Sequence, residues 1–125
     1  MSPFGGEQRI CFNLAEAEEF SPEAFVRKRL FETPGMHFNV YCIRPGQQNP
    51  LHRHPGSEEV LYFVRGYGEC VVGAKTCKVK PGDLVYVGRD VPHAVINTHA
   101  QEDLVCILAQ APLPCVHVPV DAHNP

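Results

Sequence analysis

The sequence has no apolar run of about 18 residues, the length that a membrane-spanning helix needs. Its first residues also lack the basic stretch and the following apolar stretch that mark a secretory signal peptide. We therefore expect a soluble, cytoplasmic protein that makes no contact with a membrane.

Basic residues are in short supply, because 11 Lys and Arg stand against 14 Asp and Glu, for a net charge of −3. Nucleic acids and anionic membranes bind clustered positive charge. The one basic run, Arg27 to Arg29, is interpreted as a solvated surface. No binding to nucleic acid is expected.

The cysteines form no CxxC pair, although there are six of them: Cys11, Cys42, Cys70, Cys77, Cys106 and Cys115. Reduced and mostly buried thiols are the expectation. Cys70 and Cys77 would face each other across a two-residue turn at Gly73-Ala74, where the geometry permits a disulfide. In a reducing compartment we expect them to stay free.

The sequence contains several Pro-Gly pairs that indicate tight turns. Its 125 residues suffice for one domain. Pro-Gly pairs stand at 34–35, 45–46, 55–56 and 81–82. They predict type II turns, because proline fixes the φ of the second turn position and glycine supplies the positive φ of the third. Short runs rich in β-branched and aromatic residues lie between them, at 36–44, 60–64, 84–87, 93–96 and 104–108. A hairpin is predicted over 69–79. This pattern indicates an all-β sandwich or small barrel.

Two segments have a less regular pattern. In the run 36–44, apolar Met36, Phe38, Val40 and Cys42 alternate with other residues, which predicts a strand with one core face and His37 on the opposite face. Residues 13–28 indicate either a helix or a loop that leads into a strand near residue 26. The proline-rich tail from residue 112 is expected to pack as an extended edge or to fray.

Histidines and carboxylates gather in the middle of the sequence. His52 and His54 are two residues apart, so in an extended chain both imidazoles point to one face, about 6.6 Å apart, and together bind one metal ion. Glu58 or Glu59 offers a carboxylate, and a barrel would bring His93 to the same interior. This nitrogen-rich set suits manganese, iron, cobalt, nickel, copper or zinc rather than magnesium or calcium. The alternative is a group of surface histidines on a turn.

The spacing of these residues resembles the two motifs of the cupin superfamily. Gly46, His52, His54, Glu59 and Gly66, with gaps of five, one, four and six residues, match the first motif. Gly82, the stretch 88–93 and Asn97 match the second. Gly88 stands where cupins usually carry proline, and Asp90 where they usually carry glycine. Aspartate tolerates left-handed backbone, so the loop can still form.

The resemblance implies a double-stranded β-helix, or jelly-roll, barrel with one metal ion in its mouth. By motif position the ligands are His52, His54, Glu59 and His93, with Glu59 favoured over Glu58, while Asn97 stabilises the barrel backbone. We expect an N-terminal extension over 1–25, the cupin barrel over 26–111 and a C-terminal tail over 112–125. One divalent transition metal per chain (Mn, Fe, Ni, Co, Cu or Zn) is expected.

A small metalloenzyme of the dioxygenase, isomerase, decarboxylase or lyase class is the function that this reading favours, with a small organic molecule coordinated to the metal as substrate. The alternative is a non-catalytic binding or sensing module. A general base is not identified, since Glu58, Tyr41 and Tyr62 all remain unplaced. Exposed barrel edges predict a homodimer. The remaining histidines are interpreted as bystanders: His99, His117 and His123.

Overall fold

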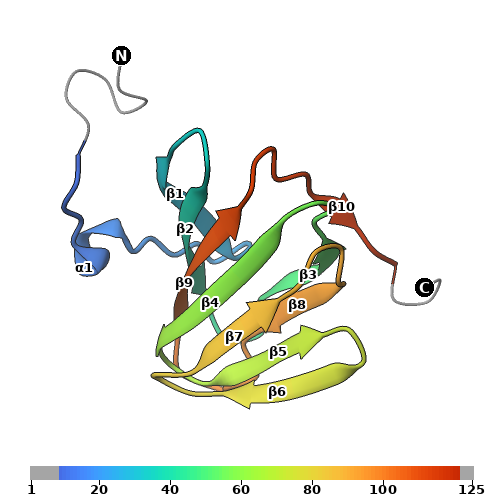
Figure 1. Ribbon diagram of the computed structural model, residues 1–125. Helices are drawn as coiled ribbons and strands as arrows, with labels where there is room; N and C mark the ends of the chain where they lie inside the picture. The colour runs from blue at the N-terminus through green and yellow to red at the C-terminus, as the bar shows by residue number, and fades with distance from the viewer. Residues whose placement is uncertain (1–8, 122–125) are drawn as a thin grey trace.

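A computed structural model of the chain describes residues 9–121. Within them, two five-stranded antiparallel sheets pack face to face (Figure 1). The first has the order β1-β2-β9-β4-β7, with strands Val26–Glu32, His37–Ile43, Leu104–Ala111, Glu58–Arg65 and Leu84–Val87. The second has the order β10-β3-β8-β5-β6, with strands Val118–Pro119, Gln48–Arg53, His93–Ile96, Gly68–Val72 and Lys75–Val79. The predicted all-β jelly roll is confirmed.

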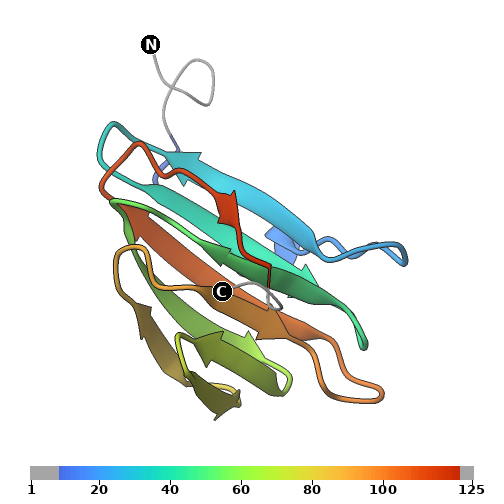
Figure 2. The same ribbon diagram turned by 90° about the vertical axis from the view of Figure 1, so that its right-hand side faces the viewer.

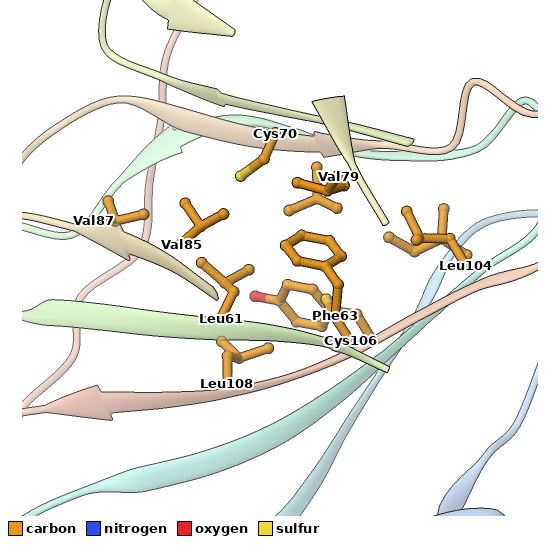
Figure 3. Packing of buried hydrophobic residues seen from close by; sticks show 12 residues of the cluster. Leu61, Phe63, Cys70, Val79, Val85, Val87, Leu104, Cys106 and Leu108 are labelled. Carbon is orange, nitrogen blue, oxygen red and sulfur yellow. The ribbon is translucent and has the colours of Figure 1, made fainter. Parts of the chain in front are cut away.

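The inner faces of the two sheets form the main core (Figure 3). Leu61 and Phe63 of β4 are fully buried there, as the period of two predicts for a strand that starts at Glu59. They pack with residues of both sheets, among them Cys70, Val79, Val85, Val87, Leu104, Cys106 and Leu108. Each large side chain so buried contributes roughly 1.5–3 kcal/mol.

Strand β2 is buried on both faces, so the prediction of a single core face was wrong. Tyr41 points into the main core, whereas Val40 and Cys42 belong to a second apolar cluster on the outer side of the first sheet. The N-terminal segment covers this outer cluster, as its position behind β1 and β2 in Figure 2 shows. Apolar residues at alternate positions indicate that one face is buried, but they leave open which face meets the other sheet.

The segment before β1 forms only one helical turn, α1 (Leu14–Ala17). Asn13 caps it by accepting a hydrogen bond from the Glu16 amide at 3.3 Å, and the chain is extended again at Glu18. A helix over 13–28 is therefore wrong, and the alternative of a loop leading into a strand near residue 26 is correct. No helix among residues 9–121 has the length and apolarity to cross a bilayer.

The six cysteines are free thiols in this structure, and the expectation that most of them are buried holds for three: Cys42, Cys70 and Cys106. Cys70 and Cys77 are direct cross-strand neighbours in the hairpin of β5 and β6, yet they remain unpaired.

Gly66 provides a test of how tightly the barrel closes. It has φ +88°, and a Cβ added there would lie 2.1 Å from the Asp103 carbonyl oxygen, whereas Gly46 has φ +83° and open space around it. Gly46→Ala should therefore cost only the left-handed backbone penalty, about 1–2 kcal/mol. Gly66→Ala should cost about 3 kcal/mol or more, because a backbone oxygen must move. Urea unfolding of both variants measures the difference, and equal losses would contradict the close approach.

Candidate metal centre

The predicted ligands lie where the ends of three strands, β3, β4 and β8, meet at the mouth of the barrel. His52 is on β3 with His54 directly after it, Glu59 is the second residue of β4, and His93 opens β8. The antiparallel pairing of β3 with β8 places His52 opposite His93. Sheet pairing thus brings together side chains that are far apart in the sequence.

The three histidines form a compact, buried cluster. Their ring nitrogens lie within 4.8 Å of one another, a spacing that can hold one metal ion. Ring centroids are 4.2 Å apart for His52 and His93, and 4.8 Å apart for His52 and His54. The Glu59 carboxylate is 3.3 Å from Nε2 of His93 and 3.5 Å from Nε2 of His54. All four side chains are at most 4% exposed.

Backbone carbonyls set the tautomer of each ring. Nδ1 of His52 lies 2.7 Å from the Pro50 oxygen, Nδ1 of His93 lies 2.9 Å from the Val91 oxygen, and Nδ1 of His54 lies 2.9 Å from the Val116 oxygen. A carbonyl can only accept, so Nδ1 carries the proton and the lone pair is on Nε2.

These inward lone pairs test whether a metal fits. Nε2 of His52 and of His93 are buried and have no hydrogen-bond partner among the described residues. A buried lone pair that faces a carboxylate is unfavourable unless a cation or a proton lies between them. The cluster therefore has the chemistry of a metal site, and its nitrogen-rich donor set suits a transition metal.

Burial and neighbouring charges adjust the protonation states. Burial lowers the pKa of His52 to about 4 and also lowers the pKa of His54, so both rings are neutral near pH 7. Burial opposes the charge on Glu59, but the nearby His93 ring outweighs burial and lowers the pKa of the Glu59 carboxyl group. Burial likewise lowers the pKa of His93, and Glu59 outweighs it, for a net rise. A metal ion that binds here would compete with protonation of His93.

A row of polar side chains extends from Glu59 across the first sheet. Nε2 of Gln110 donates to Oε1 of Glu59 at 2.6 Å, and Nδ2 of Asn39 donates to Oε1 of Gln110 at 3.5 Å. Nε of Arg29 donates to Oδ1 of Asn39 at 3.0 Å. Gln110 and Asn39 are buried, so the row orients the carboxylate toward the histidines. The sequence analysis did not identify Gln110 or Asn39. Each is a polar residue within a mostly apolar strand, and this pattern could have identified both.

The other histidines have distinct positions. His117 was interpreted as a bystander, which was wrong, because its ring stacks on His52 with centroids 4.6 Å apart and planes 19° apart. His37 lies outside the cluster, 3.1 Å from a carboxylate oxygen of Glu32. His99 caps its own loop by accepting from two backbone amides. His123 is outside the described residues.

Three other residues of the two motif regions, Glu58, Asn97 and Asp90, have the positions that the motif resemblance led us to expect. Glu58 points away from the cluster and accepts a hydrogen bond from the Tyr86 hydroxyl on the exposed face. Nδ2 of Asn97 donates to the carbonyls of Ile43 at 2.8 Å and Glu102 at 2.9 Å, which stabilises the barrel backbone. Asp90 adopts φ 63°, the left-handed backbone expected for it.

Of the three candidate general bases, Glu58, Tyr41 and Tyr62, only Tyr41 lies on the inner face of the barrel. Tyr62, by contrast, is on the exposed outer face, 41% accessible. Burial, followed by the charge of Glu59, raises the pKa of Tyr41 well above its ordinary value. Its phenol therefore stays protonated, as a hydrogen-bond donor and not as a general base.

Comparisons with known proteins agree with this fold. The uncharacterized protein MJ1618 of Methanocaldococcus jannaschii is 35% identical over 72 residues, covering 50% of this chain. This match covers 58% of that relative, so the chain spans little more than half of the curated protein's length.

Solved structures share the whole architecture. TT1209 from Thermus thermophilus has a TM-score of 0.79 at 27% identity, over 83% of this chain and 98% of that one. A double-stranded β-helix protein from Klebsiella pneumoniae has a TM-score of 0.83 at 22% identity, over 92% and 99% of the two chains. An oxalate oxidase in complex with the substrate analogue glycolate has a TM-score of 0.77 at 19% identity, over 96% and 67%. The last two likenesses show the fold alone.

The family assignment comes from the motif region itself. Residues 39–109, more than half of the chain, match the family described as the Cupin domain. This range contains the three clustered histidines and Glu59. The chain is therefore a member of the cupin family.

Proposed function

We propose that this cupin is a metal-dependent enzyme that acts on a small organic molecule coordinated to one divalent transition-metal ion. His52, His54, Glu59 and His93 would hold the ion, which is manganese, iron, nickel, cobalt, copper or zinc. The observation that carries the proposal is that the buried Nε2 atoms of His52 and His93 have no hydrogen-bond partner within residues 9–121. Nε2 of His93 lies 3.3 Å from the Glu59 carboxylate.

The chemistry follows from the ligand set. A bound ion would polarise a carbonyl or enolate oxygen or, if redox-active, activate dioxygen. Four protein ligands leave open positions on a five- or six-coordinate ion, where a substrate oxygen binds. Gln110 holds the Glu59 carboxylate in place, and the Tyr41 hydroxyl is a buried donor on the same face of the sheet. The oxalate oxidase supports this proposal as an enzyme built on the same fold.

Removal of two histidines tests the ligands. The double variant His52→Ala, His54→Ala should lose its metal and keep a folded barrel, because the ligand nitrogens go while the apolar core is intact. Elemental analysis of protein purified without a histidine tag measures metal content, and circular dichroism checks the fold. His99→Ala is the matched control and should keep a full equivalent. A double variant with a full equivalent of metal would show that the ligand assignment is wrong.

The reaction class needs a second measurement. The metal-loaded protein is screened with small organic acids and sugars, by oxygen electrode and by NMR of the products. Substrate-dependent oxygen uptake with iron identifies a dioxygenase, and turnover without oxygen identifies an isomerase, decarboxylase or lyase. If the metal-loaded protein binds one of these compounds but converts none of the compounds tested, the proposal of an enzyme is wrong and the protein is a binding or sensing module.

We also propose a homodimer that forms through the outer face of β4 and β7. Val60, Tyr62, Leu84 and Tyr86 are apolar or aromatic, yet they are between 41% and 68% exposed. Strand register places Val60 opposite Tyr86 and Tyr62 opposite Leu84, so the four side chains form one patch. A contiguous apolar patch marks an interaction surface. Free thiols are typical of proteins in a reducing compartment. We therefore propose that the dimer is cytoplasmic.

Charge on this patch should separate the dimer. The double variant Leu84→Lys, Tyr86→Lys should elute as a monomer, because burying two ammonium groups costs more than the interface returns. Light scattering after size-exclusion chromatography measures the mass. Ile10→Lys, at an exposed apolar residue away from the patch, is the control and should stay dimeric. A monomeric unmodified protein at tens of micromolar would refute this interface.

A further inference from the structure

We propose that the C-terminal segment, residues 112–120, is a working part of the metal centre, because it positions His54 and covers His52. This inference rests on the proposed function, since a positioned imidazole acts only if it binds a metal. Residues of this segment therefore act as positioning residues for a ligand, although the tail is far from the cupin motifs in sequence.

The path of the segment brings it to the histidines. It leaves the end of β9 in the first sheet and crosses to β10, which lies beside β3 in the second sheet (Figures 1 and 2). There Val118 pairs with Arg53 and Pro119 pairs with His52. The Val120 amide donates to the Leu51 carbonyl at 3.0 Å. The segment thus lines the edge of the strand that ends in the His52 and His54 pair.

His54 depends on this segment in a way that the other two histidines do not. The carbonyls that hold His52 and His93 come from Pro50 and Val91, each two residues earlier in the same stretch of backbone. The carbonyl that holds Nδ1 of His54 comes from Val116, 62 residues away. Without it, the proton of His54 can move to Nε2 and the ring can turn, which removes the inward lone pair.

Further contacts attach the segment to the same turn. Ser57, which lies between His54 and Glu59, is buried, and its hydroxyl donates to the Pro112 carbonyl at 2.7 Å. Sγ of Cys115 lies 3.5 Å from Nδ1 of His54. The His117 ring stacks on His52. The segment is therefore held at its start by Ser57, in its middle by the histidines and at its end by β3.

Shortening the chain tests the proposal. A chain that ends at Ala111 loses all of these contacts, and a matched chain that ends at Asp121 keeps them. Zinc affinity, measured by competition with a chromogenic chelator, should fall about 10- to 100-fold for the shorter chain, as for other partners of ligating histidines. Circular dichroism and urea unfolding confirm that the barrel is folded. Equal zinc affinities of the two folded chains would overturn the proposal.

A point variant covers the case in which the shorter chain does not fold. Ser57→Ala keeps the full chain and removes the anchor at Pro112, and its zinc affinity should fall about threefold or more. Thr98→Ala, which changes a hydroxyl outside the cluster, is its control. Unchanged affinity in Ser57→Ala, when the shorter chain is unfolded, would also overturn the proposal.

The imidazole tautomer gives a readout that does not need metal. Long-range proton–nitrogen NMR spectra of the metal-free full chain should show His54 protonated at Nδ1, and Ser57→Ala should show a mixture of tautomers or faster exchange of that proton. His93, which is held by a carbonyl of its own stretch of backbone, should not change. A full chain that binds none of manganese, iron, nickel, cobalt, copper and zinc refutes the proposed function, whereas an unchanged His54 tautomer in Ser57→Ala refutes the role of the segment.

Discussion

The convergence of three imidazoles and one carboxylate in a buried space is the constraint on which the arrangement of polar residues at the barrel mouth depends. Each buried polar group costs several kcal/mol unless it is paired. The barrel supplies part of the pairing, since carbonyls hold every Nδ1 and Gln110 holds Glu59. The inward Nε2 atoms of His52 and His93 remain without a hydrogen bond among the described residues. A cation would complete the arrangement, and the fold holds the four side chains close together.

The same sheets carry both an apolar core and a cluster of buried polar residues. Aliphatic and aromatic side chains fill the barrel interior away from the mouth, where closely paired strands fix Leu61 and Phe63. Polar residues of the same strands occupy the mouth, so a change of side chain along one strand, from Leu61 to Glu59, separates core from site. The outer face shows a similar division: the N-terminal segment covers β2, whereas the patch on β4 and β7 remains exposed.

Patterns of short range predicted most of the fold. Runs rich in β-branched and aromatic residues between turns placed the strands 84–87 and 93–96 with their observed bounds. The orientation of β2 was predicted incorrectly. Apolar Val40 and Cys42 pack under the N-terminal segment, whereas Tyr41 between them faces the barrel interior. Such an outcome depends on which segment covers a sheet, and that information is not present in the strand itself.

Local spacing determined the candidate ligands, since a separation of two residues puts His52 and His54 on one face of a strand and the motif adds Glu59 and His93. Only the tertiary structure decided which residues surround them. Gln110, Asn39 and the Val116 carbonyl act through contacts between strands or with the tail, and His117 reaches His52 through the pairing of β10 with β3. Periodicity assigns a side chain to a face, whereas its partner depends on how distant segments pack together.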